Sequence, residues 1–307
     1  MASTLRAGVV GAGVFGGYHA AQYARRPDVE LTAILDPHPE RAQALIDRFG
    51  GQSSPNLTAL LARVDVLSIA SPAHTHAAVA LAALAAGKHV YVEKPIATTM
   101  EDADAIVAQA RAGGLVVACG FLERAAFRAM NLFDVPRAPL RLEAVRRGPP
   151  STRSLDVSVV IDLMIHDLDL ALALSDAPPL AVEAEGARVV NRLLDEARAE
   201  GVFEDGFVAR LSASRVAETR ERTMRLVYPN GEVWIDFLAH RFENTTPFAL
   251  NAAFEETAAG RDRLGASIDA FLAAARGEAQ APLADALDGA RALDLALAVE
   301  GAAEDAP

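Results

Sequence analysis

The chain has 307 residues, of which 51% are hydrophobic and 23% are charged, a composition typical of a globular protein with one large or two smaller domains. Its net charge of −12 argues against nucleic acid or an anionic membrane surface as the main partner. A single cysteine, Cys119, allows no internal disulfide, and the apolar runs are too short to cross a bilayer, so we expect a cytoplasmic protein with no membrane partner.

The first motif is a glycine-rich turn between a predicted strand, Leu5–Val10, and an amphipathic helix at residues 17–26. Its glycines have the G-x-G-x-x-G spacing, which permits a tight turn, a close approach of the backbone to a pyrophosphate, and close packing of helix on strand. The N–H groups at the start of the helix then face the phosphates. The residues that we expect to contact a dinucleotide here are Gly11, Gly13, Val14, Phe15 and Gly16.

A carboxylate stands where a dinucleotide fold has its ribose contact. Asp36 ends a second predicted strand, Glu30–Leu35, and follows Gly16 by 20 residues. A carboxylate at this point accepts hydrogen bonds from the ribose hydroxyls of NAD and would repel the 2′-phosphate of NADP. The sequence therefore predicts NAD rather than NADP; the alternative is that Asp36 only caps the turn that follows it.

Predicted strands and helices alternate as far as residue 119, without an internal repeat or a low-complexity linker. Nearly uniform apolar strands separated by helices of about ten residues are typical of a parallel, doubly wound α/β sheet. The further strands are expected at residues 64–70, 89–92 and 115–119, and the helices at 41–49, 57–63, 77–86 and 100–112.

Polar residues follow two of these strands. The sequence SPAHTH comes after the strand at 64–70, and Glu93-Lys94-Pro95 comes after the strand at 89–92. Ligands of open α/β sheets bind beyond the carboxyl ends of the strands, so both loops are expected to line the cofactor cleft. The H-x-H pair has no cysteine or acid nearby to complete a metal site, so no metal is predicted. The expected cofactor contacts from these loops are Ser71, Pro72, His76, Glu93 and Lys94.

An almost wholly apolar helix is expected at Val159–Leu174. At 100° per residue, Asp162, His166 and Asp169 fall within about 60° of one another on one face. Buried carboxylates and imidazoles are tolerated only when they are paired or used, so this face is predicted to hold an acid/base array. The alternative is that Asp162 and His166 only bond each other and that Asp169 lies at the rim.

The pattern becomes rich in β-strands after residue 120, and Pro229-Asn230-Gly231 is a turn signal between two of the strands. We predict a mostly antiparallel, open sheet, with helices closing the chain at residues 264–276 and 283–299. Apolar positions on its uncovered face would favour oligomerisation. The predicted domains are residues 1–120, which bind the dinucleotide, and 121–307, which bind substrate and form oligomers.

Seven arginines and only two acids lie between residues 124 and 153, in a chain that is acidic overall. Such a run is often only a solvated surface. Because guanidinium groups suit phosphate and carboxylate, the alternative is an anion-binding rim beside the apolar helix. Arg124 and Arg153 are the candidate substrate contacts from this run, together with Asp169 from the helix.

Taken together, these residues resemble the glucose–fructose oxidoreductase, inositol dehydrogenase and MocA family. The matching segments are GAGVFG, the position of Asp36, SPAHTH, GKHVYVEKP and DLMIHDLD, and they are spread over most of the chain. The resemblance implies a Rossmann domain followed by an α/β domain whose open sheet mediates homodimers or homotetramers. It also implies a cis bond before Pro95.

The resemblance further implies that Lys94, Asp162 and His166 are the catalytic groups of an NAD-dependent dehydrogenase acting on a CH–OH group. His166, whose ordinary pKa is about 6.5, is then the natural base, Asp162 would orient its imidazole, and Lys94 would stabilise charge on the substrate oxygen. The proton acceptor could instead be Lys94, and the sequence leaves this choice open.

Three segments, GFLER, RRGPPSTRSLDVSVVIDLMIHDLDL and GFVARLSASRV, are similar to the subgroup that oxidises C3 of UDP-N-acetylglucosamine or its uronic acid. There the 3-keto sugar passes to an aminotransferase, which implies a nucleotide-sugar substrate and functional coupling to a PLP enzyme. Three alternatives stay open: an inositol or free-sugar dehydrogenase, an NAD-dependent glycosidase of the same fold, and a non-catalytic sensor that binds NAD.

Overall fold

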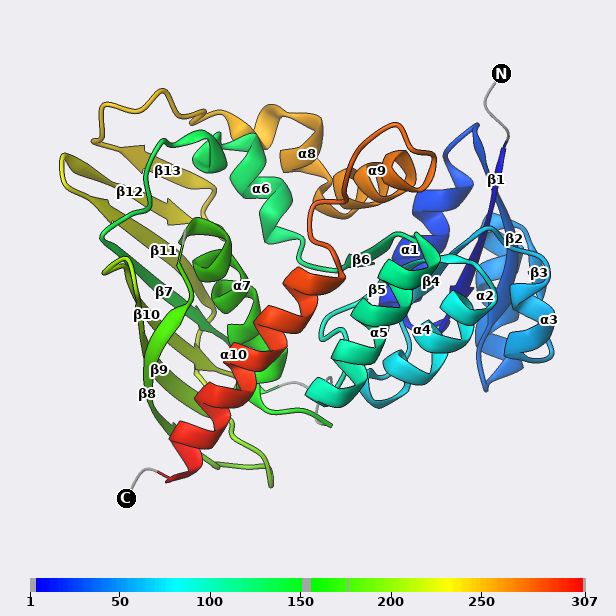
Figure 1. Ribbon diagram of the computed structural model, residues 1–307, viewed down its shortest axis with the longest axis horizontal. Coiled ribbons are helices and arrows are strands. Elements are labelled where there is room, and N and C mark those ends of the chain that lie inside the picture. Colours follow the sequence, from blue (N-terminus) through cyan, green and yellow to red (C-terminus); the bar gives the residue numbers. More distant parts are fainter. Residues whose placement is uncertain (1–3, 151–155, 176, 306–307) are drawn as a thin grey trace. The chain divides into compact units, whose positions relative to one another are not determined.

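The computed structural model describes residues 4–150, 156–175 and 177–305, which form two compact units (Figure 1). Unit 1 comprises the described residues up to Leu122 together with Asp262–Ala290. Unit 2 comprises Glu123–Arg261 and the described residues from Arg291 onward. No helix in the described part of the chain is both long enough and apolar enough to span a membrane.

Unit 1 is built on a six-stranded parallel sheet with the strand order β3-β2-β1-β4-β5-β6. Its strands are β1 (Leu5–Val10), β2 (Val29–Leu35), β3 (Gln52–Ser53), β4 (Val66–Ile69), β5 (His89–Val92) and β6 (Val117–Cys119). Its helices are α1 (Val14–Ala24), α2 (Pro39–Phe49), α3 (Leu57–Leu61), α4 (His76–Ala85), α5 (Met100–Gly113) and α9 (Arg263–Ala275). The prediction of a parallel, doubly wound sheet is confirmed.

The order of the strands reverses between β1 and β4. Val10 at the end of β1 lies opposite Ile69 at the end of β4, so the loops that leave these strands start side by side. Ligands of doubly wound sheets bind at such a switch point, beyond the carboxyl ends of the strands. The glycine turn and the loop that begins at Ser71 therefore share one edge of the sheet.

The segment Asp262–Ala290 returns to unit 1, whereas the sequence prediction assigns everything after residue 120 to a second domain. Asp262 explains the return, since its carboxylate accepts hydrogen bonds from the Gln22 side chain at 3.0 and 2.9 Å and pairs with Arg25, both from the α1 region. The same carboxylate caps α9 by accepting from the Gly265 N–H at 2.7 Å. Apolar residues of α9, among them Ile268 and Phe271, also pack into the core of unit 1, so contacts between residues distant in sequence assign this helix to unit 1.

Unit 2 is built on a seven-stranded sheet with the order β13-β12-β11-β7-β10-β9-β8. In the described part of the chain β7 and β10 pair in parallel and the other neighbours are antiparallel, which confirms an α/β unit with an open, mostly antiparallel sheet. The strands are β7 (Arg141–Arg147), β8 (Pro179–Ala187), β9 (Glu196–Phe203), β10 (Val208–Ser214), β11 (Glu221–Tyr228), β12 (Gly231–Asp236) and β13 (Arg241–Asn244). The helices are α6 (Glu123–Ala129), a π-helical turn (Val160–Met164), α7 (Ile165–Leu174), α8 (Ala258–Arg261) and α10 (Ala286–Asp305), whose first residues belong to unit 1.

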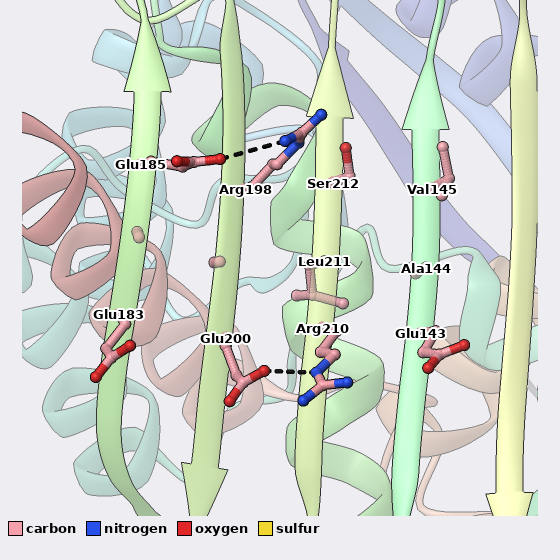
Figure 2. Close-up of a pocket in the computed structure, with 12 residues that line it drawn as sticks. Glu143, Ala144, Val145, Glu183, Glu185, Arg198, Glu200, Arg210, Leu211 and Ser212 are labelled. Atoms are coloured by element: carbon pink, nitrogen blue, oxygen red, sulfur yellow. Dashed lines mark hydrogen bonds and ion pairs between the residues drawn. The ribbon is translucent and has the colours of Figure 1, made fainter.

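One face of this sheet packs under helices and the other is open, and Figure 2 shows the open face with the helices behind it. We expected apolar positions on the open face, but across β8, β9 and β10 it carries charged side chains. Arg198 lies directly opposite Glu185, and Arg210 directly opposite Glu200, and each pair forms an ion pair. This part of the open face is therefore a ladder of cross-strand charge pairs, which are favourable between directly opposed residues.

Asp262 gives a test of how the returning segment is held. Replacing it with alanine removes the cap of α9 and two side-chain partners, so Asp262→Ala should lower the free energy of unfolding by about 2 kcal/mol. Asp269→Ala is the matched control, because Asp269 also pairs with an arginine of the α1 region but its side chain is 66% exposed. This substitution should lower the free energy of unfolding by less than about 1 kcal/mol. Urea unfolding of both variants measures the difference, and equal losses would contradict the role given to Asp262.

Candidate functional site

The glycine turn of unit 1 is packed so closely that two of its glycines cannot carry a side chain. A Cβ on Gly16 would lie 1.8 Å from the Gly11 carbonyl oxygen. A Cβ on Gly11, whose φ is +94°, would lie 2.6 Å from the Ser71 nitrogen. Gly13 differs, because nothing lies within 4 Å of the position of its Cβ. Two glycines therefore serve the packing of the turn, and the third leaves open space.

The first turn of α1 borders this open space. The helix begins after Gly13 with no side-chain cap, and Val14 and Phe15 are exposed. Uncapped N–H groups at the start of a helix favour an anion, and the dipole of the helix adds to this preference. A turn with a bare glycine and free helix N–H groups fits the pyrophosphate of a dinucleotide.

Asp36 at the end of β2 is tied to the same turn. One of its carboxylate oxygens accepts from the Ala12 N–H at 2.6 Å, and the other accepts from the His38 N–H at 2.8 Å. The alternative that Asp36 only caps the following turn is thus incomplete, because Ala12 lies between Gly11 and Gly13. The carboxylate stands beside the glycine turn, where a ribose contact is required, so these residues of unit 1 fit NAD.

His76 joins the two strand-end loops rather than a metal. Its Nδ1 lies 2.7 Å from the Pro95 carbonyl oxygen and its Nε2 lies 2.8 Å from the Ser71 carbonyl oxygen. Burial lowers the pKa of His76, so the neutral ring donates to one of the two carbonyls at a time. The bond between Lys94 and Pro95 is cis, as the resemblance implies. No group of residues suited to a metal ion occurs among the described residues.

Glu93 belongs to a buried chain of hydrogen bonds that the sequence analysis missed. Its carboxylate lies 2.9 Å from Nε2 of His19, and Nδ1 of His19 lies 2.8 Å from the Ser68 hydroxyl, which in turn lies 2.7 Å from the Tyr23 hydroxyl. All four side chains are buried, so the residue before Lys94 is anchored in the interior of unit 1. The spacing of His19 and Tyr23 on one face of α1 is the signal that could have indicated this chain.

In unit 2 the helix expected at Val159–Leu174 is not regular. Residues Val160–Met164 form a π-helical turn, and α7 starts at Ile165. Asp162 lies in the π turn and His166 in the first turn of α7, and both remain partly exposed, whereas Asp169 is fully buried. A π turn holds an extra residue, so positions do not follow the constant 100° assumed from sequence, and such turns are frequent at functional sites.

The two described candidates for substrate binding pair with each other. Arg124 donates from Nε and Nη2 to both carboxylate oxygens of Asp169 at 2.7–3.1 Å, and both side chains are buried. Arg141, Arg146 and Arg147 also have carboxylate partners, so much of the positive charge seen in the sequence is compensated within unit 2. The third candidate, Arg153, lies outside the described residues.

Glu123 and Asp167 were given no role in the sequence analysis, yet both belong to a network of ion pairs that reaches His166. Asp167 binds Arg146 in a bidentate pair at 2.7 and 3.0 Å, and Arg146 donates to Oε1 of Glu123 at 3.1 Å. Arg222 also donates to Oε1 of Glu123. The other oxygen, Oε2, lies 3.2 Å from Nδ1 of His166. The imidazole is therefore held against a buried carboxylate from α6.

Opposing effects act on Glu123. Burial alone would raise its pKa, but the charges of His166, Arg222 and Arg146 outweigh the burial and hold the pKa well below the ordinary value. Burial would likewise lower the pKa of Arg146, and its two carboxylate partners raise the pKa instead. Both groups are thus fully ionised near neutral pH.

The parallel sheet, the glycine turn and Asp36 define unit 1 as a dinucleotide-binding Rossmann unit. Residues 5–121 match the family described as "Oxidoreductase family, NAD-binding Rossmann fold", and residues 136–234 match the "GFO/IDH/MocA C-terminal domain". The chain belongs to this GFO/IDH/MocA family of NAD-binding oxidoreductases. The prediction of the family and of its cofactor is confirmed.

Among its relatives is the UDP-N-acetylglucosamine 3-dehydrogenase of Acidithiobacillus ferrooxidans, 38% identical over 98% of this chain and 97% of that protein. A solved structure of that dehydrogenase superposes with a TM-score of 0.90 and covers 99% of both chains. The D-glucoside 3-dehydrogenase of Escherichia coli is 39% identical over 62% of this chain and 59% of its own length. The WlbA dehydrogenase of Bordetella pertussis, solved with NADH and UDP-GlcNAcA, shares the fold with a TM-score of 0.88. It is 22% identical, and the match covers 99% of this chain and 96% of that one.

Gly13 and Gly16 separate cofactor binding from folding. Gly13→Ala adds a methyl group to open space, so its free energy of unfolding should stay within about 1 kcal/mol of the wild-type value. The same methyl group should weaken NAD binding roughly tenfold or more. Gly16→Ala drives a methyl group into the Gly11 carbonyl and should destabilise the protein by about 1–3 kcal/mol. Thermal unfolding and NAD titration by fluorescence measure both effects. Unchanged NAD affinity in a folded Gly13→Ala protein would contradict this assignment.

Proposed function

We propose that this protein oxidises the C3 hydroxyl of a nucleotide sugar of the UDP-N-acetylglucosamine type to a ketone, with NAD as the oxidant. The observation that carries the proposal is the similarity to the Acidithiobacillus ferrooxidans dehydrogenase, which extends over 98% of this chain and 97% of the relative. This similarity spans both units, including the part of the chain that follows the cofactor-binding unit, whereas a shared fold alone would leave the substrate open.

Unit 1 is proposed to hold the cofactor. The turn from Gly11 to Gly16 would bind the pyrophosphate, and Asp36 would accept the ribose hydroxyls and disfavour NADP. The other proposed contacts are Ser71, Pro72, His76, Glu93 and Lys94. When bound, NAD supplies the acceptor for the hydride that leaves C3. His76 and Glu93 would act mainly by fixing the loops, since their polar atoms are directed to partners inside unit 1.

The catalytic groups are proposed to be Lys94, Asp162 and His166. His166 would take the proton of the C3 hydroxyl, because imidazole is a base suited to neutral pH. Lys94, one of only two lysines in the chain, would donate a hydrogen bond to the same oxygen and stabilise its developing negative charge. Asp162, one turn before His166, would help to orient the reacting groups.

The substrate is proposed to meet unit 2 through Arg153, which would bind the pyrophosphate of the nucleotide. Arg124 and Asp169, as a buried pair, would form a wall of the sugar site and keep α6 and α7 in register. An inositol or a free sugar lacks the phosphates, and this difference separates the proposed substrate from the alternatives.

We also propose a homo-oligomer, a dimer or tetramer, formed through the open face of the sheet in unit 2. Its cross-strand charge pairs would allow polar contacts between copies. The single cysteine, buried in β6, supports a reducing, cytoplasmic location. A 3-keto sugar is a substrate for transamination, so a PLP-dependent aminotransferase is the proposed consumer of the product.

The substrate is tested by the absorbance of NADH at 340 nm. Purified protein with NAD should form NADH with UDP-N-acetylglucosamine, more completely when glutamate and a coupling aminotransferase remove the keto sugar. It should form none with myo-inositol or glucose at the same concentration. If NADH formed only with myo-inositol or glucose, the protein would be an inositol or free-sugar dehydrogenase. If the protein bound NAD but formed no NADH with any of these compounds, a glycosidase or a sensor would be favoured.

Lys94→Ala and His166→Ala should each lower kcat by about 10²–10⁴, because each removes a group that acts on the transferred proton or its oxygen. Both variants should fold, and His166→Ala should bind NAD as the wild type does. Matched controls are Lys88→Ala, at the only other lysine, and His240→Asn, at an exposed histidine in the left-handed region. Initial rates measure the effect, and full kcat in either alanine variant would refute the assigned role of that residue.

A further inference from the structure

We propose that Glu123 is a positioning residue for His166: it keeps the proton of the neutral imidazole on Nδ1 and so presents Nε2 as the proton acceptor. The inference rests on the proposed function only in assigning the proton transfer to His166. The contact itself lies wholly within unit 2, between α6 and α7.

The first ground is geometric. Oε2 of Glu123 lies 3.2 Å from Nδ1 of His166, within ion-pair distance although the two atoms are not aligned as a hydrogen bond, and both atoms are buried. A carboxylate only accepts hydrogen bonds, so the stable arrangement has the proton on Nδ1 directed at Oε2. In a neutral imidazole the second nitrogen is then an acceptor.

The second ground is that Glu123 cannot turn away. Its Oε1 accepts from Arg146 at 3.1 Å and from Arg222, and these arginines come from two neighbouring strands, β7 and β11. Arg146 is itself clamped by the bidentate pair with Asp167, the residue after His166. One oxygen of Glu123 is thus occupied by two guanidinium groups, and the other is left for the imidazole.

The third ground is electrostatic. When Nε2 takes the hydroxyl proton, the ring becomes a cation, and a carboxylate at Nδ1 stabilises that cation. In the reaction the O–H proton goes to Nε2, the C3–H bond breaks with its electron pair leaving as hydride to NAD, and the carbonyl forms. Of the charged groups near His166, Glu123 from α6 contacts the ring, and Arg146 and Arg222 from the sheet bind Glu123. Asp167 binds Arg146, Asp169 is held by Arg124, and Asp162 lies in the π turn before α7.

Glu123→Gln is the sharpest variant, because the two arginines bind oxygen but not an amide NH₂ group. The amide oxygen should therefore take the place of Oε1, and the NH₂ group should face Nδ1 and donate to it. The proton of the neutral ring would then move to Nε2, the nitrogen that must accept. We expect kcat/KM to fall by about 10²-fold or more, as when an orienting carboxylate becomes an amide in a serine-protease triad.

The pH profile separates positioning from a structural effect. Loss of the carboxylate disfavours the imidazolium, so the acid limb of kcat/KM in Glu123→Gln should move to lower pH by about one unit. Asp167→Asn is the matched control, since it also removes a buried negative charge bound to Arg146 but leaves the contact of Glu123 with His166 in place. It should move the acid limb clearly less than Glu123→Gln does, because Asp167 binds Arg146 and not the imidazole, even where it lowers stability.

A measurement without substrate keeps the inference independent of the proposed function. The ¹⁵N spectrum of labelled histidine, with the His166 signals assigned by a His166→Gln variant, should show the Nδ1–H form in wild type and the Nε2–H form in Glu123→Gln. Inversion of the tautomer in a protein that forms no NADH would refute the proposed reaction and support the positioning. An Nδ1–H form retained in Glu123→Gln, with an unmoved acid limb, would overturn the inference.

Discussion

The arrangement of unit 2 depends on one buried cation, Arg146. Its guanidinium group joins Asp167 of α7 to Glu123 of α6 from a strand in the middle of the sheet. Removing ions from water carries a large penalty, which is offset only when every partner is present with good geometry. Because the loss of any one member would leave an unpaired buried charge, the strand and both helices are locked in one register, and His166 is placed by the same contacts.

Unit 1 depends instead on the absence of side chains. The backbone at Gly11 and Gly16 approaches so closely that only hydrogen fits, and this draws the start of α1 against the switch point of the sheet. Asp36 binds the backbone N–H of Ala12 in that turn, and His76 joins the loops that follow β4 and β5 through the carbonyl groups of Ser71 and Pro95. Polar groups are thus held in place by close backbone packing in unit 1 and by buried ion pairs in unit 2.

The arginines show how the two kinds of information differ. From the sequence, the excess of arginine between residues 124 and 153 indicates a positive surface, because charges are summed along the chain. In the folded unit Arg124 meets Asp169 and Arg146 meets Asp167, both from α7, which begins at Ile165, so the charges of the two arginines are compensated inside the protein. Local composition describes the net charge of a segment, whereas the folded chain determines which of its charges reach a ligand.

The parallel sheet, the glycine turn with Asp36 and the helical segment that carries Asp162 and His166 could all be predicted from the sequence, because hydrophobic period and motif spacing depend only on neighbouring residues. The family could be predicted as well, since the matching motifs are spread along the chain. The return of α9 to unit 1, the π turn before α7 and the carboxylate at His166 became visible only in the folded chain. Each of these depends on a contact between distant residues, such as Gln22 with Asp262 or Glu123 with His166, and no periodicity along the chain records such a contact.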